Sequence, residues 1–330
     1  MKALAIENYG KNPNILDFPM PKINNDEVLV EIYAASINPL DTKIRKGELK
    51  LLLKYKMPLI LGNDFSGKIV EVGTSVTKFK VGDEVYGRPR ANKMGTFTEY
   101  ISVNQEDIAL KPKNLSFEEA ASIPLVGLTS YQALHDILRI EKGHKILIHA
   151  GSGGVGTFAI QLAKHMGAFV ATTASDGSDL VKSLGSDEVI NYKTEKFEHS
   201  IRDYNAVLDT IGGATLERSF VTLKKGGKIV SISGIPNGRF AKENGFSSFK
   251  KTLFSIASYK LTKLEKKHNV QYTFLFMKHS GEQLKILTEM LESEVIKPTL
   301  DKVFIFEDAQ KALEYGEAGR AKGKIILKLK

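Results

Sequence analysis

The chain has 330 residues, of which 42% are hydrophobic and 26% are charged, and this length suits two domains of an ordinary globular protein. Because it contains no cysteine, disulfides, iron–sulfur clusters, cysteine nucleophiles and zinc sites made of thiolates are excluded. No apolar stretch is long enough to span a bilayer, and the acidic Glu7 comes too early for the apolar core of a signal peptide. These features predict a cytoplasmic protein with no membrane partner.

The net charge of +9 is unevenly distributed along the chain. The segment Pro236–His268 carries eight lysines and arginines against two glutamates, so it supplies six of these charges. One interpretation is a surface for nucleic acid or another polyanion, and the other is a solvated helical surface. The second is favoured, because no arginine–aromatic stacking pattern accompanies the lysines. No nucleic-acid partner is therefore expected.

The first part of the chain, up to about Leu125, is predicted to consist mostly of strands separated by turns rich in glycine, aspartate and asparagine. Ser116 and Glu119 form a capping box that predicts the start of a short helix, which Pro124 is expected to end. Together these features indicate a β-rich, partly barrel-like unit. The predicted strands are Val28–Ala34, Gly67–Val72, Glu84–Tyr86 and Phe97–Val103.

A glycine-rich turn follows the apolar run Lys145–His149, which predicts a buried strand. Gly151, Gly153 and Gly156 fit the pattern G-x-G-x-x-G, and apolar residues at helical spacing follow them. A strand, a glycine turn and a helix in this order are typical of a dinucleotide site, in which the helix N-terminus meets the pyrophosphate. Gly167 is expected to end the helix.

From this point strands alternate with stretches of helical length, which predicts an α/β fold with a parallel, doubly wound sheet. After the basic segment the patterns predict a strand, a helix from about Glu282 to Leu291, another strand, another helix and a last strand, Lys324–Leu329. The other predicted strands of this part are Lys145–Ala150, Phe169–Thr173, Glu188–Tyr192, Ala206–Thr210, Lys228–Ser233, Val270–Met277 and Lys302–Phe306.

Four further segments accompany the glycine turn, namely Ala35–Gly47, Leu61–Gly73, Val81–Gly87 and Gly95–Tyr100. Together with that turn they resemble the medium-chain dehydrogenase/reductase superfamily, specifically its zinc-free branch of quinone oxidoreductases and enone reductases, over nearly the whole chain. The resemblance implies a GroES-like catalytic domain of residues 1–125 and 268–330 and a Rossmann dinucleotide-binding domain of residues 126–267. It also implies a homodimer joined along edge strands of the Rossmann domains.

Zinc-dependent members of this superfamily ligate the catalytic metal with a cysteine where this chain has Asn38. They supply a histidine or glutamate from the motif that here is Gly62–Asp64, and they carry a four-cysteine loop that is absent. The seven histidines show no spacing typical of metal ligands, so each is expected on the surface or hydrogen-bonded in the core. The resemblance therefore predicts no metal site and no zinc.

The residue that ends the second strand of a Rossmann domain selects the dinucleotide, because an acid there binds the ribose hydroxyls of NADH and repels the 2′-phosphate of NADPH. Aligned with the superfamily, this position is Ser175, and Tyr192 matches a tyrosine that approaches the same phosphate. A shift of one residue would instead place Asp176 there. Many relatives also have a lysine shortly after the serine, whereas this chain has Asp179 nearby. The balance favours NADPH over NADH.

The resemblance also implies the further cofactor contacts. They comprise nicotinamide-side residues, backbone around the pyrophosphate, the carboxyl end of a sheet strand, a segment that borders the nicotinamide or equally forms core strand, and a pair that closes over the cofactor. In that order they are Asn38 and Thr129; Gly151, Ser152, Gly153, Gly154, Val155 and Gly156; Ser233 and Gly234; Phe274, Leu275 and Phe276; and Gly323 and Lys324.

Addition of hydride to a quinone or an enone leaves negative charge on the carbonyl oxygen, which without zinc needs a hydrogen-bond donor or a cation. Lys43 is the main candidate, because it follows Asn38 in a motif whose lysine or tyrosine faces the substrate in this branch. Tyr55 and the amide of Asn38 are further catalytic candidates, and Asp41 is expected to order the loop. A solvated Lys43 without a catalytic role is the alternative.

The sequence thus predicts a zinc-independent, NADPH-dependent oxidoreductase that reduces quinones or α,β-unsaturated carbonyls by direct hydride transfer. One alternative is an enoyl-thioester reductase, in which the basic segment would meet the phosphates of the acyl carrier. The other is a nucleotide-bound protein that uses this segment to bind RNA or another polyanion.

Overall fold

The computed structural model describes residues 1–330, which form two compact units. Unit 1 consists of Met1–Leu128 and Lys278–Lys330, and unit 2 consists of Thr129–Met277. The expected return to the first domain at residue 268 is thus ten residues too early. The reason is that the strand Gln271–Phe274 pairs in parallel with the strand before it and extends the sheet of unit 2.

Unit 1 is built on a seven-stranded sheet and a smaller three-stranded one. Its strands are β1 (Lys2–Ile6), β2 (Asn14–Asp17), β3 (Glu27–Ile37), β4 (Leu59–Ile60), β5 (Asp64–Val72), β6 (Glu84–Gly87), β7 (Tyr100–Asn104), β8 (Ile108–Leu110), β15 (Leu300–Ile305) and β16 (Lys324–Lys328). The large sheet has the order β15-β16-β3-β5-β6-β8, with β7 also paired to β3, and the small one has the order β2-β1-β4. Only β15 and β16 pair in parallel. The long central β3 explains this arrangement, since Val28, Val30 and Ile32 alternate into one buried cluster.

Helices at the ends of these strands complete unit 1. They are α1 (Pro39–Lys46), α2 (Phe117–Ala121), α3 (Pro124–Tyr131, in which the chain passes into unit 2), α11 (Gly281–Glu292) and α12 (Ala309–Glu317), with the short turns η1 (Ala91–Lys93), η2 (Gln105–Asp107) and η5 (Phe306–Asp308). The predicted capping box is confirmed: Glu119 N donates to Ser116 Oγ, and Ser116 N donates to the Glu119 carboxylate. Pro124 starts α3, a helix that the sequence analysis missed, because a proline is also favourable in a first helical turn.

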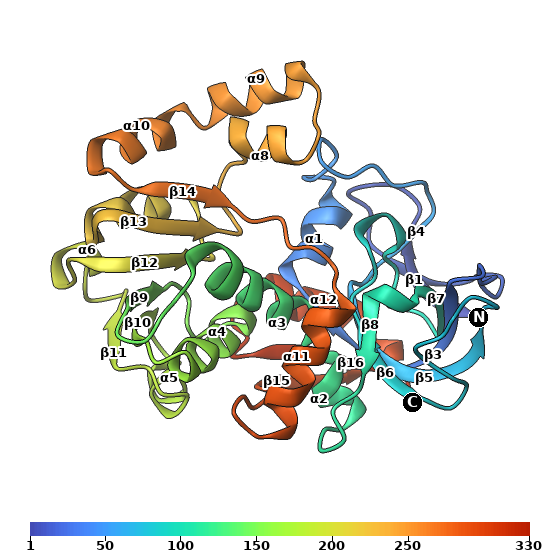
Figure 1. Ribbon diagram of the computed structural model, residues 1–330. Coiled ribbons are helices and arrows are strands. Elements are labelled where there is room, and N and C mark those ends of the chain that lie inside the picture. Colours follow the sequence, from blue (N-terminus) through green and yellow to red (C-terminus); the bar gives the residue numbers. More distant parts are fainter. The chain divides into compact units, whose positions relative to one another are not determined.

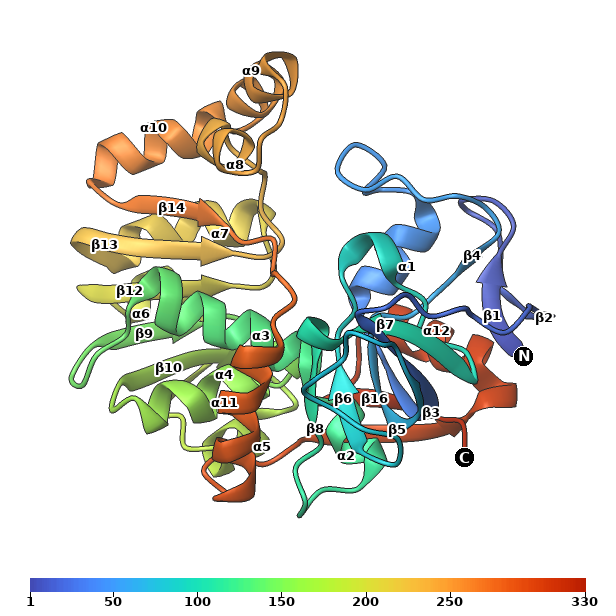
Figure 2. The ribbon, with the colours of Figure 1, turned by 45° about the vertical axis from the view of Figure 1, so that its right-hand side comes forward.

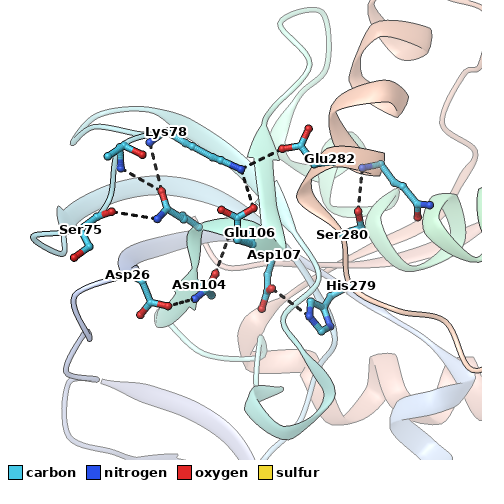
Figure 3. A network of polar contacts seen from close by, with 12 residues as sticks. Asp26, Ser75, Lys78, Asn104, Glu106, Asp107, His279, Ser280 and Glu282 are labelled. Carbon is cyan, nitrogen blue, oxygen red and sulfur yellow. Dashed lines mark hydrogen bonds and ion pairs between the residues drawn. The ribbon is translucent and has the colours of Figure 1, made fainter. Parts of the chain in front are cut away.

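A polar network attaches α11 to the N-terminal part of unit 1 (Figure 3). Lys78 Nζ lies 2.7 Å from Glu106 Oε2 and 3.1 Å from Glu282 Oε1. Nearby, His279 Nε2 lies 3.6 Å from Asp107 Oδ1. The segment that returns to unit 1 is therefore held by polar contacts of His279 and Glu282 with Asp107 and Lys78.

Unit 2 contains the predicted parallel sheet, and its strand order β11-β10-β9-β12-β13-β14 is that of a doubly wound nucleotide-binding fold. The strands are β9 (Lys145–Ile148), β10 (Phe169–Ala174), β11 (Glu188–Asn191), β12 (Tyr204–Asp209), β13 (Leu223–Ser231) and β14 (Gln271–Phe274). Every pairing in this sheet is parallel. Leu147 of the central β9 faces a fully buried core with Val207 and Ile229. The prediction of an α/β fold is confirmed.

The helices of unit 2 connect these strands (Figure 1). They are α4 (Gly154–His165), α5 (Ser178–Ser183), α6 (Phe197–Ser200), α7 (Gly213–Ser219), α8 (Gly238–Glu243), α9 (Ser248–Ala257) and α10 (Tyr259–His268), with the π-helical turn η3 (Gln132–Leu138) and the turn η4 (Phe220–Thr222). The basic segment forms α8, α9 and α10, which lie beyond β14 at one end of the sheet (Figure 2). No helix of the chain combines the length and apolar character needed to cross a bilayer.

Candidate active site

The glycine turn lies between β9 and α4, where the sequence predicts a dinucleotide site. A Cβ at Gly151 would come within 2.0 Å of Thr172 Oγ1, and one at Gly156 would come within 2.4 Å of the carbonyl oxygen of Ala150. Both glycines are therefore required by the protein's own packing. Gly153 is different, because the nearest atom to a Cβ there is 3.4 Å away. The packing of the chain leaves room for a side chain at this position.

The start of α4 offers unpaired backbone donors. Gly153 is the N-cap and supplies no side chain to the first turn. The first N–H groups of an α-helix have no partner within the helix, and the helix dipole makes this end positive. The turn therefore fits the diphosphate of a dinucleotide, which would be held by Ser152–Val155. Gly167, with φ of 81°, follows the end of α4, as expected.

The ends of β10 and β11 bring together the residues expected to select the cofactor. Ser175 Oγ donates to Tyr192 Oη at 2.9 Å, so the two predicted residues form one hydroxyl pair. Lys193 Nζ lies 2.9 Å and 3.0 Å from the two carboxylate oxygens of Asp176. Lys193 was not singled out from the sequence, and its charge compensates the carboxylate that complicated the prediction of NADPH.

The loop after β10 is closely packed against the glycine turn. A Cβ at Gly177 would lie 2.5 Å from Ser152 Cβ. The residues that would meet the adenosine end of a dinucleotide thus contact those that would meet its diphosphate.

The remaining predicted cofactor residues of unit 2 lie near the carboxyl ends of β13 and β14. Ser233 Oγ donates to the carbonyl oxygen of Thr210 at 2.9 Å, and a Cβ at Gly234 would lie 2.4 Å from Tyr272 Oη. Phe274 stacks edge-on against Phe240, with ring centroids 5.1 Å apart. Leu275 is buried, Phe276 is half-buried, and Thr129 is buried in α3. A contact of any of these side chains with the cofactor stays a prediction.

Unit 1 contains a buried polar network around the start of α1. Asn38 Nδ2 donates to Asp64 Oδ2 at 3.0 Å and to the carbonyl oxygen of Ser36 at 3.2 Å. Lys324 Nζ donates to Asn38 Oδ1 and lies 3.4 Å from Asp64 Oδ2. The amide of Asn38 is thus engaged within the protein, and the ammonium of Lys324 points into this network. A role of Gly323 and Lys324 in closing over the cofactor stays a prediction.

Asp41 connects the network to the loop before β5. Its carboxylate accepts from Asn38 N at 2.8 Å and from Asn63 Nδ2 at 2.7 Å, so it orders the loop as expected. Burial raises the pKa of Asp41 to about 7, although these two hydrogen bonds oppose the shift. Burial also lowers the pKa of Lys324, against the nearby charges of Asp64 and Asp41. Burial therefore favours the neutral form of both Asp41 and Lys324.

The two other predicted catalytic residues have available donor groups. Lys43 is half-buried on α1, and its ammonium makes no hydrogen bond or ion pair. The buried hydroxyl of Tyr55 also lacks a partner, although its ring packs against a core cluster of unit 1. Burial raises the pKa of Tyr55, so this group stays a protonated donor at neutral pH. The Lys43 ammonium can donate to an oxygen of a bound molecule, whereas the Tyr55 hydroxyl is a donor without a partner in the interior of unit 1.

Arg88 is a candidate that sequence reasoning missed. It follows β6 and is only 3% exposed, and its buried Nε has no hydrogen-bond partner. Burial lowers its pKa, while the charges of Asp64, Asp107 and Asp41 favour its cationic form. Its charge also acts on the phenol of Tyr55, which indicates that the two groups are neighbours. An arginine in a loop is usually exposed, so no local signal could have identified it.

The histidines match the expectation that they occupy structural positions. His149 is fully buried, with Nδ1 3.2 Å from Thr173 Oγ1 and Nε2 2.9 Å from Ser219 Oγ. Burial lowers its pKa to about 3, so it stays neutral. No group of three or more histidine, aspartate or glutamate side chains is arranged to hold a metal ion.

Comparisons with known proteins agree with this architecture. The model of the alcohol dehydrogenase GroES-like domain matches residues 24–113, and the model described as zinc-binding dehydrogenase matches residues 184–327. The 2-methylene-furan-3-one reductase of Solanum lycopersicum is 35% identical over 99% of this chain and 79% of its own length. The mitochondrial NAD(P)H oxidoreductase RTN4IP1 of Homo sapiens is 34% identical over 99% of this chain and 89% of its own length. The crystal structure of the Escherichia coli quinone oxidoreductase complexed with NADPH has a TM-score of 0.84 and 26% identity, and covers 100% of both chains.

Proposed function

Because this chain belongs to the medium-chain dehydrogenase/reductase superfamily, in its branch of quinone and enone oxidoreductases, we propose that it is a zinc-independent, NADPH-dependent reductase of quinones or α,β-unsaturated carbonyls. The chain is an oxidoreductase with a nicotinamide cofactor, as its relatives are. The phosphate on that cofactor, the substrate class and the independence from zinc are the proposed parts.

The observation that carries the proposal is the glycine turn before α4. Two of its glycines are required by packing, while Gly153 is not. A close approach of a diphosphate to the backbone explains the glycine that the protein's own packing does not require. When bound, the nicotinamide supplies the hydride chemistry.

Three side chains support the preference for NADPH. The hydroxyls of Ser175 and Tyr192 lie together: Ser175 donates to Tyr192, and the phenol proton of Tyr192 is left to donate to a phosphate oxygen. Lys193 compensates the charge of Asp176, so that the carboxylate repels a 2′-phosphate less. This arrangement removes the main argument for NADH.

The network around Asn38 supports reduction without zinc. Asn38 and Asp64 belong to the two segments from which zinc-dependent relatives ligate their metal. Here these side chains bind the ammonium of Lys324, which already supplies a buried cation. A neutral amide and one carboxylate are also a weak ligand set for zinc compared with thiolate and imidazole.

On the substrate side, the donors are those that lack partners within the chain. Lys43 would stabilise the carbonyl oxygen as it gains negative charge, because its ammonium is not neutralised by a neighbouring acid. Tyr55 would donate a second hydrogen bond from its buried hydroxyl. Arg88 strengthens this environment through its positive charge.

The test is steady-state consumption of NADPH by the metal-analysed protein with 1,4-naphthoquinone, short 2-alkenals and methyl vinyl ketone. We expect acceleration by at least one class, with no stoichiometric zinc and no inhibition by a chelator. If neither class accelerates NADPH oxidation above background, the proposal is wrong. Turnover of enoyl thioesters alone would instead assign the protein to that reaction, and turnover that requires zinc would overturn the metal-free mechanism.

We further propose a homodimer joined along an edge of the unit 2 sheet, and a location in the cytoplasm. β11 and β14 end this sheet. The outer side of β14 is engaged within the chain, because Tyr272 N donates to the Glu265 carboxylate and the Tyr272 carbonyl oxygen accepts from Arg239. β11 is therefore the edge strand proposed to pair with a second copy. Sedimentation analysis tests the dimer. Fractionation of cells tests the location, and recovery of the protein in mitochondria, the compartment in the name of the human relative, would overturn it.

A further inference from the structure

Helix α9 exposes an apolar stripe that no catalytic role explains. Phe249, Leu253 and Ile256 are 78%, 39% and 69% exposed, and their spacing places them on one face of the helix. We call these three residues the α9 stripe. Phe254 instead is buried and stacks against Phe240 and Phe246, so it attaches the helix to unit 2. The stripe therefore points away from the contact that holds α9 in place.

The stripe lies within the most basic part of the chain. Residues 236–268 carry eight basic and two acidic side chains. Two of these basic residues form ion pairs, Arg239 with Glu265 and Lys260 with Glu217. The exposed lysines of this segment that are outside these ion pairs include Lys251, on another side of α9, and Lys266 and Lys267 on α10. An exposed apolar face on a helix in a lysine-rich segment is the pattern of a helix that lies in a membrane interface.

A hollow of about 560 Å³ runs beside the stripe. It is lined by Ser248, Lys251, Thr252, Ser255, Ile256 and Tyr259. The hydroxyls of Thr252 and Ser255 donate to backbone carbonyls of α9. The Ser248 hydroxyl and the Lys251 ammonium can bind phosphate oxygens, while Ile256 and Tyr259 line the same hollow. This combination suits a phospholipid, whose headgroup is anionic and whose chains are apolar.

We propose that α9 and the start of α10 dock on an anionic lipid surface. This differs from the expectation of no membrane partner, and it concerns a surface contact that does not depend on the proposed reaction. A second copy of the chain fits this face less well, because two strongly basic segments would then oppose each other. Three side chains also form a small patch compared with a stable protein interface. A negative lipid surface complements both the charge and the stripe.

The chain contains no tryptophan, which allows a direct test. In the full-length Phe249→Trp variant, the only tryptophan lies in the stripe. Titration with phosphatidylglycerol-containing vesicles should shift its emission to shorter wavelength, and lipids brominated in their chains should quench it. Phe169→Trp is the matched control, because Phe169 is also exposed but lies at the start of β10, and it should show neither effect.

Vesicle flotation separates the apolar from the electrostatic contribution. The unmodified chain should bind phosphatidylglycerol-containing vesicles at least roughly tenfold more tightly than pure phosphatidylcholine, and less tightly as salt rises. Phe249→Ser with Ile256→Ser should weaken this binding, while Val303→Ser with Ile305→Ser, two exposed residues of β15, should not. Lys251→Glu should weaken it as well. Melting temperatures and NADPH oxidation confirm that each variant is folded.

Three results would overturn the proposal. One is no binding of the unmodified chain to anionic vesicles at low salt. Another is binding that the stripe variant leaves unchanged, since a general polyanion surface would behave in this way and would also bind RNA. The third is a dimer that the stripe variant dissociates, which would show that a second copy covers α9.

Discussion

Lys324 Nζ lies 3.4 Å from Asp64 Oδ2, although 260 positions separate the two residues in the chain. Lys324 is on β16 and Asp64 is at the start of β5, and β3 pairs with both strands. Both side chains are almost fully buried. The ion pair therefore links the two strands on either side of β3 and connects the last strand of the chain to its N-terminal part.

Replacing Lys324 with methionine should destabilise the protein strongly. The variant keeps the apolar volume but leaves Asp64 buried without its cation, a change that typically costs about 3–5 kcal/mol. The free energy of unfolding, measured by urea denaturation, checks this value. Lys328→Met on the same strand is the control, because its ion pair with Glu118 is partly exposed and should contribute at most about 1 kcal/mol. Equal losses in the two variants would contradict the interpretation.

Asp41 should make the stability of the protein depend on pH. Since burial raises its pKa from 3.8 to about 7, the folded protein holds a proton there over a range in which the unfolded chain has released it. Its contribution to stability is therefore present at low pH and is lost as pH rises toward the folded pKa. Between about pH 5 and about pH 8 this loss should amount to about 3 kcal/mol.

The Asp41→Asn variant isolates this effect, because asparagine does not titrate. Urea denaturation of both proteins over the same pH range should show a stability difference that changes in favour of the variant as pH rises. Titration of groups that do not interact with Asp41 cancels in this comparison. Parallel pH profiles would show that Asp41 is ionised throughout.

The glycine turn allows packing and ligand approach to be separated. Gly153→Ala should leave the melting temperature unchanged, because a Cβ fits there, but should weaken NADPH binding by at least roughly tenfold. Gly156→Ala should lower both, since its Cβ would collide with the backbone of Ala150 and Gly151. Calorimetric titration and thermal melting provide the two measurements. An unchanged NADPH affinity in Gly153→Ala would show that the diphosphate does not approach the backbone of this turn.

Lys193 should influence the choice between the two dinucleotides. Lys193→Ala releases the carboxylate of Asp176 and should raise the Kd of NADPH roughly tenfold at low salt, with little effect on NADH. Adding Asp176→Asn should restore most of the NADPH affinity, because the repulsive charge is then gone. If the affinities for NADPH and NADH fall equally in Lys193→Ala, the lysine only supports the structure of the loop.

Lys43 should act on turnover and not on cofactor binding. Lys43→Met is expected to lower kcat by roughly 100-fold while the Kd of NADPH stays the same. The reason is that the lost cation stabilises the carbonyl oxygen of the substrate chiefly when negative charge develops there in the transition state. Lys46→Met, on the same helix but exposed and paired with Glu317, is the control and should keep its activity. An unchanged kcat in Lys43→Met would return the catalytic role to Tyr55 and Arg88.

Local patterns were sufficient to predict the parallel sheet and the glycine turn. Apolar runs and helical spacing are properties of neighbouring residues, and a strand, glycines and a helix in sequence limit the geometry closely. The pairing of Lys324 with Asp64 and the burial of Arg88 depend on strands far apart in the chain, so no local pattern contains them. The same holds for Lys193, whose partner lies at the end of a different strand. The strand β14 was predicted, but not that it belongs to unit 2.

The packing of Gly177 against Ser152 has a consequence for how this enzyme can change. A side chain at position 177 would press on Ser152 in the turn proposed to hold the diphosphate, so a substitution made there to change the ribose preference should also change the overall affinity for the dinucleotide. Engineering toward NADH should therefore retain the glycine at 177 and begin with the outward-facing pair of Lys193 and Asp176.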